Sequence, residues 1–254
     1  MKKLLFVLIA ISSLFSFSCG KKETVIKMGT NAAFPPFEWV EGKEVVGFDV
    51  TLSNLIANDY GKTLKVVDMS FDGLIAALQA GSVDFIASGM TATDERRKSV
   101  DFSDPYYSSK QTIIVRVSNK SVSSVADLKG LAIGVQAATT GEIYATEEID
   151  GANVKSFRTV IDAALALKNS AIEAIIIDEL PAKEIVKSNP ELKIVDDDFF
   201  TDEYAIAVKK GNTELLNSIN NTIRTIKANG IYQKMLEAYM PLDGDVKIVT
   251  PEEL

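Results

Sequence analysis

The sequence predicts an α/β protein of two lobes, each a mostly parallel β-sheet flanked by helices, joined by a two-strand hinge. Three observations lead to this fold class. Short apolar runs alternate with amphipathic helical patterns, which is typical of parallel sheets covered by helices. The alternation stops and restarts once, and two short segments separate the two halves. A chain of 254 residues is long enough for two such units.

The first half reads as strand, helix, strand, helix, strand. Asp49 is the expected N-cap of the first helix, and Gly61 and Gly81 are expected to end the two helices. The expected strands are residues 25–29, 64–67 and 83–87, and the expected helices are residues 48–60 and 72–80.

The second half repeats this pattern. A fully apolar strand at 174–177 ends in Asp178, and Thr140 opens a helix after the strand at 131–135. Further helices are expected at 160–168 and 179–187. Polar residues thus follow several strands at their C-terminal ends, where open α/β sheets bind ligands.

Two segments between the halves are the predicted hinge. Each precedes a β-rich run, so the chain is expected to leave lobe 1, build lobe 2 and return. Helices at 214–229 and 231–240 would then pack back on lobe 1. The predicted boundaries are a signal peptide at 1–19, lobe 1 at 20–105 and 205–240, hinge segments at 106–110 and 201–204, lobe 2 at 111–200, and a loosely attached C-terminal tail at 241–254.

The N-terminus has the pattern of an export signal. Lys2 and Lys3 precede an apolar run at 4–17, which is too short for a membrane-spanning helix. Small residues precede Cys19, and the segment resembles a bacterial lipoprotein signal, although Ser16 stands where leucine is usual. The resemblance implies a lipidated Cys19 and a periplasmic or extracytoplasmic protein attached to the membrane through its lipid. Ordinary cleavage near position 18, or retention as a weak anchor, is the alternative.

Composition excludes several function classes. The sequence has no histidine and one cysteine, so it lacks the commonest general base and cannot form an intramolecular disulfide. Zinc is disfavoured for the same reason, and we expect no metal and no cofactor. The net charge of −8 argues against a nucleic-acid partner.

A proline-containing stretch, TNAAFPPF, offers an aromatic wall. Asn31 and Phe34 lie on it, just after the first strand, and Phe71 precedes the second helix. Two aromatic rings can enclose an aliphatic or flat group. The alternative for Phe34 is a core aromatic in a rigid loop.

The stretch SGMTATDERR is a candidate anion site. Ser88, Gly89 and Thr91 follow a strand, and Arg96 lies on a short helix that Thr93 could cap. A guanidinium beside hydroxyl and backbone groups suits a carboxylate. The neighbouring residues Arg97 and Lys98 are expected to be surface charges.

The second half supplies complementary groups. A helix N-terminus at Thr140 favours an anion, and the Asp178 carboxylate needs a cationic or hydrogen-bonding partner, such as a ligand ammonium. Both residues could instead be plain helix caps. Taken together, the groups describe a receptor for a free α-amino acid.

The order and spacing of these motifs resemble the amino-acid solute-binding proteins of bacterial ABC importers, the extracellular solute-binding family 3. The resemblance covers about residues 25–239 and rests on the segments GTNAAFPPFEW, VGFDV, MSFDGLIAALQAG, GMTATDERRKSVDFSDPYY, DLKGLAIGVQAATTGE, IIIDELPA and YAIAVKKGNTEL. It implies the periplasmic-binding-protein fold, in which two lobes close on the ligand. It also implies a monomer that partners membrane permease subunits and their ATPase.

The resemblance assigns roles to the candidate residues. Gly89, Thr91 and Arg96 would hold the α-amino and α-carboxylate groups from lobe 1, with Thr140 adding a carboxylate contact and Asp178 taking the ammonium. Phe34 and Phe71 would enclose the ligand side chain, with Asn31 near its tip; Ser88 lies beside them.

The motifs also depart from the family pattern. Asn31 replaces an aspartate often found with cationic ligands, so arginine, lysine and glutamine all remain candidates. Ala138 and Glu173 replace the usual glycine and aspartate. Two other functions compete with transport. A ligand-sensing domain for signalling would need a membrane span and cytoplasmic modules, and a dehydratase-like enzyme would use Glu142 or Glu173 as an acid. Because neither glutamate has a catalytic partner in the sequence, we expect no enzyme activity.

Overall fold

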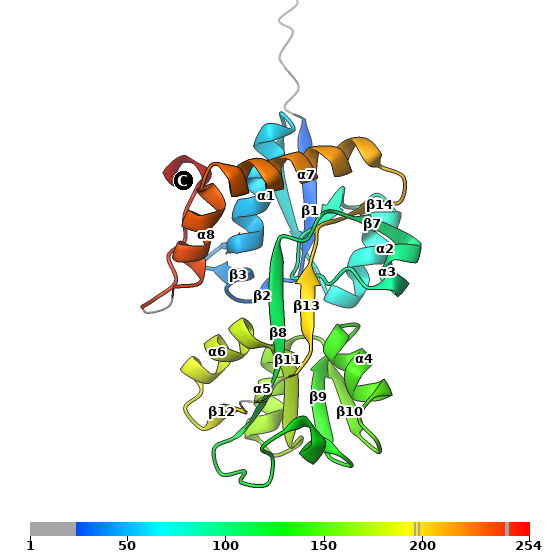
Figure 1. Cartoon of the computed structure of the whole chain (residues 1–254), viewed down its shortest axis with the longest axis vertical. Coiled ribbons are helices and arrows are strands. Elements are labelled where there is room, and N and C mark those ends of the chain that lie inside the picture. The colour runs from blue at the N-terminus through cyan, green and yellow to red at the C-terminus, as the bar shows by residue number, and fades with distance from the viewer. Residues whose placement is uncertain (1–23, 196, 198, 242–243) are drawn as a thin grey trace, which may run out of the picture.

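The computed structural model describes residues 24–195, 197, 199–241 and 244–254. Two α/β lobes lie end to end, and two strands run between them (Figure 1). This arrangement confirms the predicted fold class. The predicted signal peptide and Cys19 lie outside the described residues. Among the helices that the structure describes, none has the length and apolar character needed to cross a bilayer.

Lobe 1 is built on a five-stranded sheet. Strand β1 is parallel to β5 and β6, and β14 pairs antiparallel with β6 and β7. The strand order is β5 (Thr63–Asp68), β1 (Val25–Thr30), β6 (Phe85–Ile86), β14 (Ala207–Lys209) and β7 (Val100–Phe102).

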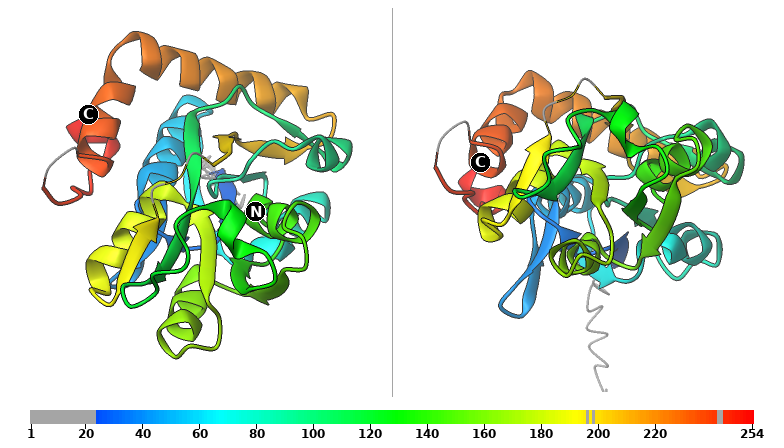
Figure 2. Two further views of the ribbon diagram at one scale, coloured as in Figure 1. Left: turned by 60° about the horizontal axis from the view of Figure 1, so that its bottom comes forward. Right: turned by 90° about the horizontal axis from the view of Figure 1, so that it is seen from below.

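Helices cover both faces of this sheet. Figure 2 shows the long helix α7 and the following α8 along the outside of lobe 1, next to the C-terminus. The apolar residues of α7 recur every three or four positions and are buried, as an amphipathic helix requires. The helices of lobe 1 are α1 (Phe48–Asp59), η1 (Phe71–Gly73), α2 (Leu74–Gln79), α3 (Asp94–Ser99), α7 (Thr213–Ala228) and α8 (Ile231–Tyr239).

Lobe 2 repeats the scheme. Strands β10, β9 and β11 are parallel, and β8 runs antiparallel between β11 and β12. Separate apolar clusters form the core of this lobe. Its elements are β8 (Tyr107–Arg116), η2 (Val125–Leu128), β9 (Ala132–Gln136), α4 (Thr140–Glu147), β10 (Asn153–Phe157), α5 (Val160–Lys168), β11 (Ala174–Asp178), α6 (Glu179–Ser188) and β12 (Leu192–Val195).

The connection between the lobes is a two-stranded ladder. Strand β13 (Thr201–Tyr204) pairs antiparallel with the first part of β8, so that Tyr204 lies opposite Tyr107. Tyr106 and Tyr204 are buried in the core of lobe 1. Of the segments assigned to the hinge from the sequence, residues 201–204 and 107–110 lie in this ladder, and Tyr106 immediately precedes it.

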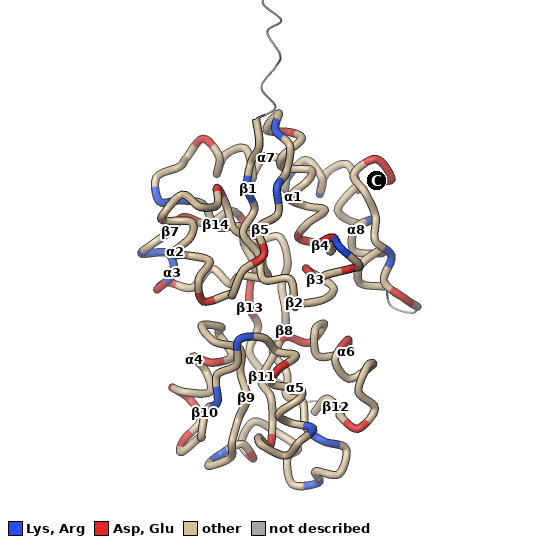
Figure 3. The backbone as a smooth tube through the Cα atoms, turned by 180° about the vertical axis from the view of Figure 1, so that it is seen from behind, with Lys and Arg blue, Asp and Glu red and all other residues tan. Residues whose placement is uncertain are grey.

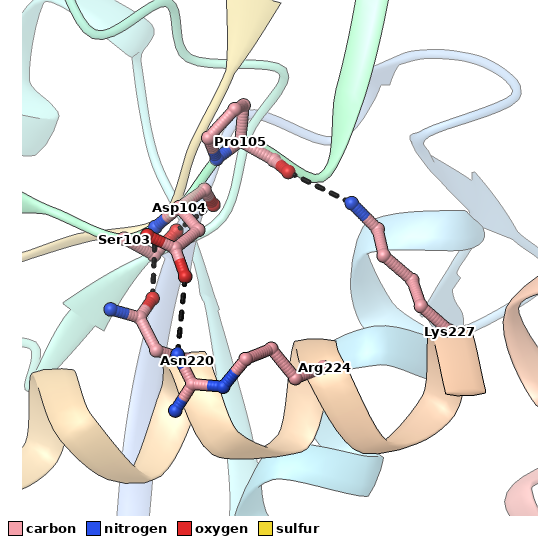
Figure 4. Close-up of polar contacts among 6 residues, drawn as sticks. All are labelled: Ser103, Asp104, Pro105, Asn220, Arg224 and Lys227. Carbon is pink, nitrogen blue, oxygen red and sulfur yellow. Dashed lines mark hydrogen bonds and ion pairs between the residues drawn. The ribbon is translucent and has the colours of Figure 1, made fainter. Parts of the chain in front are cut away.

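Helix α7 holds the chain just before it enters the ladder (Figure 4). The Asp104 amide donates to Asn220 Oδ1 at 2.8 Å, and Arg224 pairs with the Asp104 carboxylate at 3.3 Å. Lys227 donates to the Pro105 carbonyl at 3.1 Å. The lobe 1 end of the ladder is therefore anchored to the outer helix of that lobe.

A small three-stranded sheet was not predicted. It consists of β2 (Ala33–Phe34), β3 (Glu38–Glu41) and β4 (Glu44–Val46). The pairing places Phe34 opposite Glu38 and brings both to the space between the lobes.

The prediction that Asp49 is an N-cap is wrong. The N-cap of α1 is Gly47, whose φ of 135° favours glycine; an added Cβ would lie 2.1 Å from the Phe37 carbonyl oxygen. Asp49 lies inside the first turn and is buried. Its carboxylate accepts from the Gly89 amide at 2.9 Å and from the Tyr106 hydroxyl at 2.7 Å.

The expectation of a loosely attached C-terminal tail is also wrong. Lys247 N donates to the Ala238 carbonyl at 2.8 Å, and Thr51 Oγ1 donates to the Val249 carbonyl at 3.0 Å. Asp245 pairs with Lys187 of α6 in lobe 2 at 2.7 Å. The segment ends in η3 (Pro251–Glu253), so it packs on lobe 1 and reaches lobe 2. Figure 3 shows acidic and basic residues interspersed over both lobes, which is typical of a solvated surface.

Candidate functional site

A pocket lies between the lobes, with about 350 Å³ of empty space when the open solvent around it is included. The structure places all nine sequence-predicted site residues around it; their contact with a ligand remains a prediction. The predicted residues are Asn31, Phe34, Phe71, Ser88, Gly89, Thr91, Arg96, Thr140 and Asp178, and the lining also includes Glu38, Gln136 and Thr139.

Arg96 is a fixed cation in the lobe 1 wall. Its guanidinium donates to the carbonyl oxygens of Thr91 and Ala138, both at 2.7 Å. Thr93 caps the short helix α3, as predicted, by accepting from the Arg96 amide at 3.2 Å. Burial lowers the pKa of Arg96 to about 10, which leaves it charged at neutral pH. Its guanidinium carbon lies 5.4 Å from the Phe71 ring centroid, over the ring.

The two predicted aromatic residues line the pocket from separate elements, β2 and η1. Phe34 packs against apolar residues of both lobes, which makes it a core contact as well as a pocket wall. Gly89 lies directly beneath it with φ of 49°, and an added Cβ would come within 2.9 Å of Phe34 Cε1. Glycine at this position therefore lets the ring approach the backbone.

Asp178 is the anionic wall on lobe 2. It precedes α6, but its side chain makes no capping hydrogen bond, which leaves the carboxylate directed to other partners. The Tyr204 hydroxyl donates to it. Burial, together with the charge of Asp202, raises the pKa of Asp178 to about 6. The carboxylate would gain from a cationic partner in the pocket.

Thr140 is the first residue of α4, and Thr139 is the N-cap, accepting from the Glu142 amide at 3.4 Å. The Thr140 hydroxyl donates to Asp202 at 2.7 Å, and Gln111 donates to the same carboxylate oxygen at 2.9 Å. The N-terminus of this helix lies at the pocket through Thr139 and Thr140, in a position to bind an anion.

Gln136 was missed by the sequence reasoning, although it ends a strand as Asp178 does. Its side-chain amide donates across the pocket to Asn31 Oδ1 at 2.8 Å and to the Arg158 carbonyl at 3.2 Å. The Asn31 amide nitrogen donates to the Met69 carbonyl at 2.9 Å. Asn31 is thus oriented by lobe 1 and bonded to lobe 2.

Glu38 was also missed, because the small sheet that positions it was not predicted. Only 1% of its surface is exposed, and its Oε1 accepts from Ser88 Oγ at 2.9 Å. Ser88 Oγ in turn accepts from the backbone amide of Asn31 at 3.0 Å. Burial raises the pKa of Glu38 well above its usual range, and the nearby Asp49 raises it further.

The site has the chemistry of a receptor. It presents one cation, two carboxyl groups, two aromatic walls and several hydroxyl and amide groups. Within the described part of the chain, no group of three His, Cys, Asp or Glu side chains is arranged to hold a metal ion.

Comparisons with known proteins agree with this chemistry. The family model for bacterial extracellular solute-binding proteins, family 3, matches residues 26–241. A probable histidine-binding protein of Campylobacter jejuni is 36% identical, covering 94% of this chain and 99% of that protein. ABC transporter arginine-binding protein 1 of Escherichia coli K12 is 34% identical, and the match covers 95% of this chain and 100% of that protein. The solved structure of an ancestral arginine-binding protein bound to arginine is 40% identical with a TM-score of 0.82. The match covers 85% of this chain and 98% of that chain.

Proposed function

The chain belongs to the bacterial extracellular solute-binding proteins, family 3, and from that premise we propose that its solute is a free L-amino acid with a basic side chain. The protein would present this ligand to the permease of an amino acid ABC importer. The observation that carries the proposal is the set of charges around one pocket: Arg96, Asp178 and the buried Glu38.

The amino acid head group would bind between Arg96 and Asp178. The guanidinium and the Thr91 hydroxyl take the α-carboxylate, with the α4 N-terminus at Thr140 completing the contact. Asp178 and Gly89 take the α-ammonium. The support is that these groups line one pocket and that burial disfavours the charged forms of both Arg96 and Asp178 until a counter-charge arrives.

The side chain would extend between Phe34 and Phe71 toward Glu38. A carboxyl that is 1% exposed and whose described hydrogen bonds come only from neutral groups is a partner for a guanidinium or ammonium. Asn31 and Ser88 would add hydrogen bonds at the tip. This favours arginine or lysine over glutamine.

Closure of the two lobes would trap the ligand. We propose residues 106–110 and 201–204 as the hinge, between lobe 1 (20–105 and 205–240) and lobe 2 (111–200), with 241–254 as a C-terminal segment. The contacts of Gln136 with Asn31 and of Arg96 with Ala138 cross the pocket and would form on closure. The permease would recognise the closed monomer and use ATP elsewhere; the protein itself would bind without catalysis.

The proposal includes the cellular setting. Cleavage of the signal peptide before Cys19 and lipidation of that residue would hold the protein on the outer side of the cytoplasmic membrane. Two lysines precede the apolar run, and small residues precede the cysteine, which supports this part of the proposal.

Calorimetric titration of the purified protein tests the proposal. The protein is first unfolded and refolded to remove amino acid carried over from the cells, then titrated with each common amino acid. Tight binding restricted to arginine, lysine or another basic amino acid is the expected result. Binding of glutamine alone would overturn the choice of side chain, and silence toward every amino acid would overturn the proposed function.

A further inference from the structure

Two buried carboxyl groups lie behind the pocket, close enough for each to influence the protonation of the other. They belong to Glu38 of β3 and Asp49 of α1. Glu38 is 1% exposed and Asp49 is fully buried. Glu38 also lines the pocket, so the pair connects the ligand site with the interior of lobe 1.

The hydrogen-bond donors around the pair leave a place for one proton. Ser88 Oγ donates to Glu38 Oε1, and the Gly89 amide and Tyr106 hydroxyl both donate to Asp49 Oδ2. Among the described residues, no hydrogen-bond donor reaches Glu38 Oε2 or Asp49 Oδ1. Ionised carboxylates only accept hydrogen bonds, so two buried oxygens without a donor favour a proton on one of the two groups.

The surroundings of the pair supply no positive charge among the described contacts. The titratable groups that face it are Asp68 of β5, Tyr106 before β8, and Tyr232 of α8. These are acidic or neutral. Burial raises the pKa of both carboxyl groups, that of Asp49 to about 6, and the charge of Asp49 raises the pKa of Glu38 further. The pair therefore keeps a proton at neutral pH when the pocket holds no cation.

We infer that a cationic ligand side chain displaces this proton, so that the Glu38–Asp49 pair exchanges one H⁺ for the bound cation. The inference rests on the proposed function. On binding, the O–H bond of the protonated carboxyl breaks and the proton passes to solvent, while the ligand keeps its own charge. Glu38 then pairs as a carboxylate with the ligand cation.

This exchange makes Glu38 a residue that determines specificity. A neutral side chain offers no charge to replace the proton and leaves the pair protonated. A cationic side chain is bound with proton release, so its affinity rises about tenfold per pH unit while the pair remains protonated in the free protein. Arginine is the suitable probe because its guanidinium stays charged throughout this range.

Calorimetry in two buffers of different ionisation enthalpy measures the protons released. At pH 7.5 we expect about one proton released per arginine bound and none for a neutral amino acid such as glutamine. Asp178 faces the head group that both ligands share, so any proton it releases is the same for both. The difference in proton release between arginine and glutamine therefore reports on the Glu38–Asp49 pair. In Glu38→Gln, arginine should bind more weakly and release no proton.

The outcomes separate the inference from the proposed function. Tight arginine binding with the same heat in both buffers overturns the proton exchange and leaves the proposed function intact. Equal proton release with arginine and glutamine would also overturn it, since the proton would then come from the head-group site. Absence of binding by every amino acid would overturn both. The wild-type comparison decides the matter even if the variant fails to fold.

Discussion

Lobe 1 and lobe 2 hold their pocket residues in different ways. In lobe 1, Arg96 is held by Thr91 and Thr93, and Ser88 is bonded to Glu38; Arg96 also has one partner in lobe 2, the Ala138 carbonyl. In lobe 2, several polar groups have partners outside the lobe. Asp178 accepts from Tyr204 and Thr140 donates to Asp202, both in the connecting strand β13, and Gln136 donates to Asn31 of lobe 1.

The difference indicates an order of events. On the proposed function, we expect the lobe 1 groups to be in place before the ligand arrives and Gln136 to reach Asn31 only when the lobes are together. Ligand binding would then shift the protein toward the closed arrangement through contacts that lobe 2 makes only there. Variants of the lobe 1 site residues should therefore have the larger effect on amino acid binding, and variants of the lobe 2 site residues should have a smaller one.

The largest effect is expected in lobe 1. Arg96→Ala should weaken amino acid binding by roughly 2–5 kcal/mol, because the ligand carboxylate stays buried without its ionic partner. Titration calorimetry measures the change. Lys98→Ala, two residues away and paired only with exposed Glu95, is the control and should leave affinity unchanged. Unaltered binding by the Arg96 variant would refute the head-group assignment.

A smaller loss is expected from lobe 2. Asp178→Asn should weaken binding by about 1–3 kcal/mol by removing the ionic contact with the ammonium while keeping a hydrogen-bonding group. The same measurement with arginine and with lysine should show an equal loss, since the contact is to the head group. A loss that depends on the side chain would contradict the assignment.

Asp178 also predicts a pH effect on the ligand-free protein. Its pKa of about 6 lies above the ordinary value of 3.8, so between these values the folded protein holds a proton that the unfolded chain lacks. Its contribution to stability is therefore fully present below about pH 4 and is lost as pH rises through 6. Thermal unfolding from pH 4 to 7 should show a smaller decline for Asp178→Asn than for the wild type. Identical profiles would argue against a buried, ionising Asp178.

A third variant tests contact between the lobes directly. Gln136→Ala removes the hydrogen bond to Asn31 and should cost about 0.5–1.5 kcal/mol of binding. The ligand-bound protein should also be less compact by small-angle scattering. Gln233→Ala, on the outer helix α8, removes a bond to Glu237 and serves as the matched control. Equal behaviour of the two variants would exclude a role for Gln136 in closure.

The smallest effect belongs to the C-terminal segment. Lys187→Ala breaks the exposed pair with Asp245 that joins lobe 2 to this segment. Because exposed ion pairs contribute little, affinity should change by less than about twofold. Lys183→Ala breaks a pair within α6 and should change nothing. A large change in the Lys187 variant would show that the segment governs closure.

The sequence predicted the regular elements best where periodicity and caps agree. The helix expected at 160–168 is confirmed as α5, with Thr159 as its N-cap, and the strand expected at 174–177 is confirmed within β11. The small sheet β2–β4 was missed because its strands are two to four residues long and lack a sustained alternation. The error at Asp49 has a similar origin, since the tight approach of Gly47 to Phe37 is a tertiary contact.

The candidate site was predictable where a residue follows a strand within a recognisable motif, as with Arg96 and Asp178. Glu38 could not be found in this way. Its place depends on pairing with Phe34 across a hairpin and on burial against Asp49, neither of which local spacing reveals. Gln136 also stands at the end of a strand, but it carries no charge that would have marked it as a site residue.

Trp39 is the single tryptophan of the chain and follows Glu38 in β3. Because side chains alternate along a strand, its indole faces away from the pocket. It packs edge-on against Tyr239 at 6.3 Å between ring centroids, and the Tyr239 hydroxyl accepts from the Val249 amide at 3.2 Å. The tryptophan emission of the protein therefore comes from one indole beside the C-terminal segment. We expect its spectrum to report whether that segment is seated.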